Sequence, residues 1–274
     1  MYKITDGKYR LPYIEALAGM GVMDTGTTEP MKIRGVDSLT GDRGQYVVKY
    51  IKSSRMSEKS SCRELLGAWM ARELEINVIE PVIINITREF AETLLGENGY
   101  HSALKSVGLN FGSVYEAGYM ELVKGRFKLQ DQLLEQAKMI FMFDMFVANA
   151  DRGAGKPNVI TNSDNFLVFD HELAFSFADL LSFARNPEPW TLGLAEKYLY
   201  ESHLFYPYLR GADIDFTAQT EKLTLINSNF WNRVNEFVPT EWRTDEIEDI
   251  KTHTEKIIAN RNIFSNELTK ILMS

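Results

Sequence analysis

Cysteine is nearly absent from the sequence, since Cys62 is the single one among 274 residues. One thiol can neither form an internal disulfide nor supply a cluster of thiolate metal ligands. Histidine is also scarce, and the four histidines are dispersed without the spacing of a zinc site. These absences exclude disulfide-stapled folds and thiolate metal centres, and they favour a reducing compartment. We expect Cys62 to be a small buried apolar residue and not a catalytic thiol.

Long apolar runs and an excess of positive charge are missing as well. No uninterrupted apolar run reaches the roughly 18 residues that a membrane-spanning helix needs. The closest approach, residues 139–150, is short and carries Asp144, and residues 1–10 have no apolar signal core. The formal net charge is −8, and no long Lys/Arg block offsets it. We therefore expect a cytoplasmic protein that binds neither a membrane nor nucleic acid.

Hydrophobic residues make up 45% of the chain, which is enough for a well-buried core. The first third is rich in strand signals. Residues 31–35 and 45–51 flank the turn Gly41–Gly44 and predict a hairpin. Residues 60–75 have helical spacing, and residues 77–86 predict a strand in which Pro81 lies at an edge or a bulge.

Helical periodicity dominates the second half. It begins near Leu129, is interrupted by a short strand at residues 166–170, and ends in one long helix that Thr244 or Asp245 caps. The pattern predicts an α+β fold with a β-rich N-terminal part, residues 1–122, and a larger helical part, residues 123–274. A cleft between two such parts is a common ligand site.

The residues most typical of catalysis lie between Asn149 and Asp170. A helix ends in a glycine-containing loop, and a short apolar strand then presents a second carboxylate. Asp151, Asn158 and Asp170 can converge there, and such hard oxygen ligands suit Mg²⁺ together with substrate phosphates. Asp151 taken alone is also an ordinary turn residue. Asp144, on the preceding apolar helix, is expected to be a buried structural carboxylate.

A cationic group for phosphates is available upstream. Lys49 lies in the apolar strand Tyr46-Val47-Val48-Lys49-Tyr50, and Glu64 on the following helix can hold it by an ion pair. This strand-lysine and helix-glutamate arrangement is the one that protein kinases use. Lys49 taken alone is more typical of a solvated edge strand, so the pairing with Glu64 carries the prediction.

Six short motifs follow one another along the chain: Val47-Val48-Lys49, Arg63-Glu64-Leu65, Phe111-Gly112-Ser113, Asn149-Ala150-Asp151-Arg152, Pro157-Asn158 and Asp170-His171. In this order they resemble the motifs of HipA-like kinases, most of all the compact branch that lacks the extra N-terminal domain of the HipA toxin. The resemblance covers roughly residues 20–180, and the resemblance to phosphatidylinositol kinases is more distant. The resemblance implies a bilobal protein-kinase-like fold with ATP and Mg²⁺ as cofactors.

The resemblance also implies roles for single residues. Asp151 would orient or deprotonate the acceptor hydroxyl, Lys49 would contact the ATP phosphates, and Glu64 would position Lys49. Asn158 and Asp170 would bind Mg²⁺. The remaining nucleotide contacts would come from a phosphate loop and from the connection between the lobes, at Thr25, Gly26, Thr27, Thr28 and Glu121.

The sequence departs from the family at Lys156, which stands where the family often has asparagine, five positions after the catalytic aspartate. If Lys156 points into the site, its positive charge either replaces part of the charge that the metal would supply or weakens metal binding. The expected reaction is transfer of the ATP γ-phosphoryl group to a hydroxyl, on a protein serine or threonine or on the chain itself. The alternatives are a non-catalytic nucleotide-binding module and a lipid or small-molecule kinase.

Overall fold

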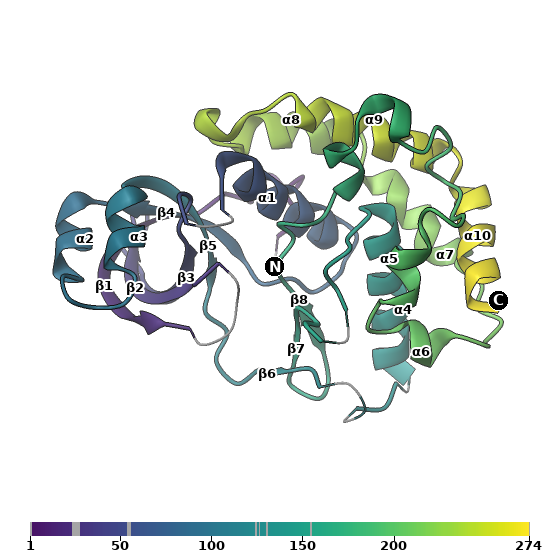
Figure 1. Cartoon of the computed structure of the whole chain (residues 1–274), viewed down its shortest axis with the longest axis horizontal. Helices are drawn as coiled ribbons and strands as arrows, with labels where there is room; N and C mark the ends of the chain where they lie inside the picture. Colours follow the sequence, from purple (N-terminus) through teal and green to yellow (C-terminus); the bar gives the residue numbers. More distant parts are fainter. Residues whose placement is uncertain are drawn as a thin grey trace.

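The computed structural model describes residues 2–23, 28–53, 56–123, 125, 127–129, 131–153 and 155–273. Helices and strands both occur, so the predicted α+β class is confirmed. Figure 1 shows a strand barrel at one end of the molecule and most of the helices at the other end.

Five strands form a closed barrel in the order β1-β2-β3-β5-β4. Neighbouring strands are antiparallel except β1 and β4, whose parallel pairing closes the barrel. The interior is filled by apolar side chains such as Ile33, Val48 and Ile84, each 0% exposed. The strands are β1 (Tyr13–Val22), β2 (Met31–Asp37), β3 (Arg43–Lys49), β4 (Pro81–Ile86) and β5 (Gly108–Val114).

Two glycines allow the barrel to close. A Cβ atom at Gly112 of β5 would lie 2.2 Å from Cδ1 of Ile84, and one at Gly35 of β2 would lie 2.3 Å from Cγ2 of Ile14. Both distances are far below van der Waals contact, so any side chain at these positions would push apart the strands that pair here. Two short helices, α2 (Arg88–Thr93) and α3 (Tyr100–Lys105), lie beside the barrel in Figure 1.

Helix α1 (Glu58–Glu73) packs between the barrel and the helical part of the molecule. Ser57 caps its N-terminus in a reciprocal hydrogen-bonded pair with Ser60. Residues 61–73 of the helix are all buried, so the helix has no solvated face. Cys62 lies on it with 2% exposure, and burial raises the pKa of its thiol to about 12, which agrees with the buried structural role expected for this residue.

The helical part surrounds the larger hydrophobic core, to which α1 also contributes. None of the helices within the described ranges is long and apolar enough to cross a membrane. A three-stranded sheet, β6 (Met120–Glu121), β7 (Val159–Thr161) and β8 (Phe166–Val168), joins this part to the barrel. The longer helices are α4 (Asp131–Phe146), α8 (Ser228–Phe237), α9 (Glu246–Ala259) and α10 (Arg261–Met273). The short ones are η1 (Ser176–Asp179), η2 (Ser182–Ala184), α5 (Lys197–Glu201), α6 (Tyr206–Leu209), α7 (Thr217–Glu221), η3 (Lys222–Leu225) and η4 (Thr240–Trp242).

Strand β1 and the C-terminal helix differ from the sequence-based expectation. Strand β1 was not predicted, because its two alanines, leucine and methionine favour a helix, and pairing with β2 and β4 overrides that propensity. The expected single C-terminal helix is two helices. Asn260 ends α9, its side chain donates to the Lys256 carbonyl at 2.9 Å, and its own carbonyl accepts the first bonds of α10. Asp245 precedes α9, but its side chain makes no capping bond.

His253 on α9 predicts a pH dependence of stability. Its ring stacks on Phe177 at 3.5 Å between centroids, and burial, with Lys256 and Arg185 nearby, lowers its pKa to about 3. Below about pH 6.5 the unfolded chain binds a proton at this position that the folded chain does not bind. The contribution of His253 to the free energy of unfolding is therefore fully present above pH 6.5, and it is lost progressively as the pH falls from 6.5 toward 3.

We expect the free energy of unfolding to fall between pH 7.5 and pH 5 by about 1–2 kcal/mol more in the parent than in His253→Phe. Urea unfolding at the two pH values measures this difference. Equal losses in the two proteins would show that His253 is protonated in the folded state as readily as in the unfolded chain.

Candidate active site

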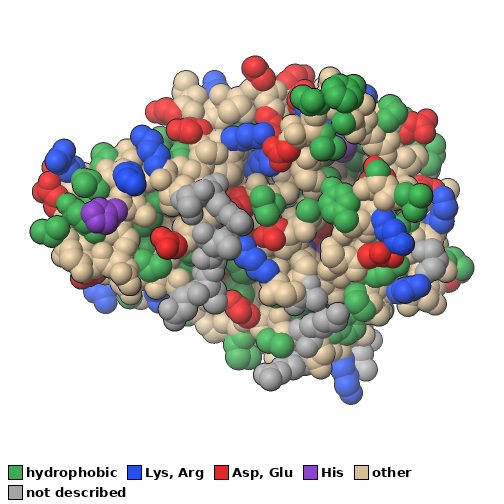
Figure 2. Space-filling model, in the orientation of Figure 1, with side chains coloured by type: hydrophobic (Ala, Val, Ile, Leu, Met, Phe, Trp, Pro, Cys, Tyr) green, Lys and Arg blue, Asp and Glu red, His purple; other side chains and the backbone are tan. Residues whose placement is uncertain are grey.

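A cavity of about 640 Å³ lies between the barrel, α1 and the loops on either side of the β7–β8 hairpin. Its apolar wall includes Val47 of β3, Val78 and Ile160, and its polar end holds Lys49, Asp170 and Lys156. In the space-filling view, acidic and basic side chains lie together near the middle of the face where the barrel meets the helical part (Figure 2). An apolar slot with a few convergent charges is typical of a small-molecule site.

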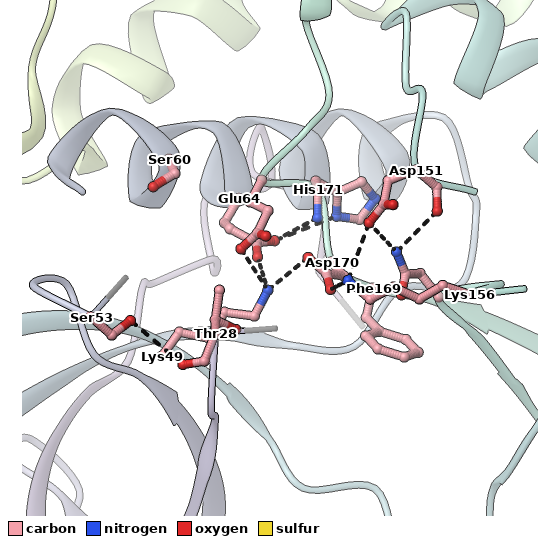
Figure 3. Close-up of polar contacts among 12 residues, drawn as sticks. Thr28, Lys49, Ser53, Ser60, Glu64, Asp151, Lys156, Phe169, Asp170 and His171 are labelled. Atoms are coloured by element: carbon pink, nitrogen blue, oxygen red, sulfur yellow. Dashed lines mark hydrogen bonds and ion pairs between the residues drawn. The ribbon is translucent and has the colours of Figure 1, made fainter. Parts of the chain in front are cut away.

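Lys49 is the last residue of β3, and its ammonium is shared among three carboxylates (Figure 3). It donates to Glu64 of α1, to Oδ1 of Asp170 at 2.7 Å and to Oε2 of Glu172 at 3.5 Å. Burial by itself lowers the pKa of this lysine, but the carboxylates outweigh burial and raise it. Lys49 is therefore a buried cation aimed into the cavity, 121 residues away from Asp170 in the chain.

Glu64 joins α1 to the loop that follows β8. One of its oxygens accepts from Lys49, and the other accepts the backbone N–H of His171 at 2.7 Å. Burial raises the pKa of Glu64 to about 7, although Lys49 acts in the opposite direction. Gly67, one helical turn further on, leaves room for the His171 ring, since a Cβ there would lie 2.5 Å from Cβ of His171.

Asp170 follows β8 and lies between two lysines. Its Oδ1 accepts from Lys49, and its Oδ2 accepts from Lys156 at 3.2 Å. The two ammonium groups outweigh the effect of burial and hold the pKa of Asp170 well below its usual range. The backbone of Asp170 has φ = 61°, a left-handed conformation that is uncommon outside glycine and that occurs often at functional sites.

Asp151 lies in the loop between α4 and β7, on the other side of Lys156. Its Oδ2 accepts from Lys156 at 3.2 Å and from Nδ2 of Asn158 at 3.1 Å. The side chain of Asn149 accepts the backbone N–H of Asp151 at 3.2 Å. Lys156 therefore bridges the two carboxylates, Asp151 and Asp170, that the sequence predicted to converge (Figure 3).

A buried charge network holds this loop. Asp144 of α4 accepts from Nε of Arg152 at 2.5 Å and from His203 at 2.9 Å, and all three side chains are 0% exposed. Arg152 in turn donates to the backbone carbonyls of Asn158 at 2.7 Å and Phe169 at 3.4 Å. One buried arginine thus ties the loop of Asp151 to the residue before Asp170. Asp144 is the buried structural carboxylate that the sequence indicated.

The remaining sequence-predicted residues are distributed as follows. Thr25, Gly26 and Thr27 lie outside the described residues. Thr28 is 3% exposed and lines the cavity, as does Glu121 on β6. Asn158 and Asp170 are linked through Asp151 and Lys156, and the acidic side chains whose oxygens lie within 4.8 Å of one another are Glu64, Asp170 and Glu172.

Sequence reasoning missed Glu172. Its side chain is 4% exposed and contacts Lys49, and burial raises its pKa. The feature of the sequence that could have indicated Glu172 is its position two residues after Asp170, in the run Asp170-His171-Glu172. Carboxylate and amide oxygens are the ligands that Mg²⁺ prefers, so the residues around Asp170 fit a hard divalent cation.

Two comparisons with known proteins bear on this site. A family model described as HipA-like kinase matches residues 20–269, which is most of the chain and includes every residue of the site named above. A search of curated proteins found no match.

Proposed function

Because the chain belongs to the HipA-like kinase family, we propose that it transfers the γ-phosphoryl group of ATP to a hydroxyl acceptor with the help of Mg²⁺. The observation that carries the proposal is the buried Lys49 ammonium, held by Glu64 and Asp170 at the polar end of an apolar cavity. A strand lysine paired with a helix glutamate is the phosphate-binding device of protein kinases.

The proposal assigns the two halves of the molecule to two lobes. Residues 1–122, which contain the barrel, form the nucleotide-binding lobe, and residues 123–274 form the helical lobe with the catalytic loop. The apolar wall at Val47, Val78 and Ile160 would take the base, and Lys49 would take the phosphates. Thr28 and Glu121, which also line the cavity, would add contacts to the nucleotide.

The catalytic step follows from the position of Asp151. The acceptor oxygen forms a bond to the γ-phosphorus while the bond between that phosphorus and the β–γ bridging oxygen breaks, and ADP leaves with the electron pair. The carboxylate of Asp151 orients the acceptor hydroxyl and takes its proton. Asp170 and the amide oxygen of Asn158 would hold Mg²⁺, which neutralises phosphate charge when bound.

We propose a protein serine or threonine as the acceptor. The segment after Asp170 is hydrogen-bonded to the start of the loop that carries Asp151, because the N–H of Phe175 donates to the Val147 carbonyl at 2.7 Å. The same segment exposes Leu181 and Phe183, at 68% and 85% exposure. Exposed apolar side chains on the segment that follows Asp170 suit a polypeptide better than a small polar molecule.

ATP binding provides the test of the proposed function. Lys49→Met is expected to weaken ATP affinity by about 10- to 100-fold, because a charge-assisted contact to phosphate is lost. Calorimetric titration with ATP and Mg²⁺ measures the affinity, and circular dichroism checks that the variant is folded. Lys222→Met, which removes a lysine from an exposed pair with Glu75, is the control. A parent protein that binds no ATP would refute the proposed function.

A second function is favoured by one observation. Both oxygens of Asp170 are paired with lysines, which is compatible with a module that binds nucleotide without turning it over. Transfer assays with γ-labelled ATP separate the two functions. Label on the chain or on added protein supports the kinase, whereas tight ATP binding without any transfer supports the non-catalytic module.

A further inference from the structure

Lys156 holds together the two carboxylates that the proposed reaction needs. Its Nζ atom lies 3.2 Å from Oδ2 of Asp151 and 3.2 Å from Oδ2 of Asp170. Figure 3 shows its side chain between them, on the side of Asp170 away from Lys49.

The two lysines around Asp170 are held differently. Lys49 is 11% exposed, contacts three carboxylates and cannot leave without stranding buried charge. Lys156 is 37% exposed and contacts two carboxylates, so its long aliphatic side chain can move the ammonium into solvent. The Lys156 side of Asp170 is therefore the side that another cation can take.

The donor atoms on that side also suit a divalent cation. Oδ2 of Asp170 and Oδ2 of Asp151 both contact the Lys156 ammonium, and Nδ2 of Asn158 donates to the same oxygen of Asp151. On the opposite side, the acidic group Glu64, Asp170 and Glu172 already shares the Lys49 ammonium. A divalent cation there would compete with the three ion pairs of Lys49, whereas on the other side it competes with the two ion pairs of Lys156.

We propose that Lys156 is a positioning residue that competes with the divalent cation for Asp170. Binding of the cation displaces the ammonium from Oδ2 of Asp170 and so breaks the bridge that also holds Asp151. Metal binding and release of the catalytic carboxylate are thereby coupled in one loop. The inference rests on the proposed function only in taking Asp170 as the place where the cation binds.

Titration with Mn²⁺ alone, followed by electron paramagnetic resonance of the free ion, tests the competition without nucleotide or turnover. We expect Lys156→Met and Lys156→Gln to bind Mn²⁺ at least about tenfold more tightly than the parent, because one positive charge leaves the ligand oxygens. Lys156→Arg keeps the charge and should stay within about threefold of the parent. Lys251→Met removes a lysine that is 34% exposed and paired with Glu248, and it controls for the change in net charge.

The comparison of the variants has three outcomes that would overturn the inference. They are equal or weaker Mn²⁺ binding by both neutral variants, tightening of Lys156→Arg as large as that of Lys156→Met, and equal tightening in Lys251→Met. Absence of Mn²⁺ binding in the parent and in both neutral variants would also overturn it. If the neutral variants tighten as expected but the parent neither binds ATP nor transfers phosphoryl groups, the proposed function fails and the competition at Asp170 stands.

Discussion

Replacing Asp151 with alanine is expected to lower kcat for phosphoryl transfer by about 10²- to 10⁴-fold, the usual contribution of a positioned general base. The affinity for ATP should stay within about threefold of the parent, because Lys49 and the apolar wall of the cavity are untouched. The asymmetry follows from the role proposed for Asp151, which acts on the acceptor hydroxyl and not on the nucleotide. Transfer of label from γ-labelled ATP measures kcat, and calorimetry measures the affinity.

Two variants make this result interpretable. Asp151→Asn keeps the size of the side chain and should lose nearly as much activity as Asp151→Ala, since the amide cannot take the proton. Asp164→Ala removes an exposed carboxylate from the loop between β7 and β8 and should keep full activity. If Asp151→Ala retains more than about a tenth of the parent kcat, Asp151 is not the catalytic base.

The second large effect is expected on stability. Asp144→Ala should lower the free energy of unfolding by about 3–5 kcal/mol, because it leaves the Arg152 guanidinium buried without a counter-charge. His203 loses its acceptor in the same change. A loss of this size is a large fraction of the stability of a typical domain, so the midpoint of urea unfolding should shift clearly.

A double-mutant cycle identifies the cause of this loss. Asp144→Ala combined with Arg152→Met should lose less than the sum of the two single losses, because the double variant buries no unpaired charge. Glu201→Ala breaks an exposed pair with Lys197 and should cost no more than about 0.5 kcal/mol. Additive losses in the cycle would mean that Asp144 stabilises the chain through packing and not through its charge.

The same network explains why a structural variant should also lose activity. Arg152 donates to the backbone carbonyl of Asn158, a proposed metal-binding residue, and to that of Phe169, which precedes the other one, Asp170. Loss of Asp144 frees Arg152 to move, and the two loops then lose their common anchor. Stability and catalysis are therefore linked through one buried arginine, although Asp144 itself is not among the residues that line the cavity.

Much of the site could be predicted from single stretches of sequence. Lys49 lies in an apolar strand, Glu64 lies on a helix that the sequence predicted over residues 60–75, and Asp170 follows a short strand. Each of these features depends on neighbours within a few residues, so local patterns can reveal it. The roles assigned to these residues came from the resemblance to HipA-like kinases, and the match over residues 20–269 supports the family.

The fold was predicted less completely where long-range pairing competes with local propensity. The two alanines, the leucine and the methionine of β1 favour a helix, yet this segment pairs with β2 on one side and with β4 on the other. At Asn260 the apolar stripe continues across the break between α9 and α10, so periodicity alone could not reveal the two helices.

The sequence by itself determined which chemical groups are available: a strand lysine, a helix glutamate, two loop carboxylates and the unusual Lys156. The tertiary structure decided which of them meet. Lys49 and Asp170 lie 121 residues apart, and their contact depends on how the barrel packs against the β7–β8 hairpin. Likewise, only packing decides that Lys156 points between Asp151 and Asp170, because a surface lysine has many rotamers and the partners that select one come from separate loops.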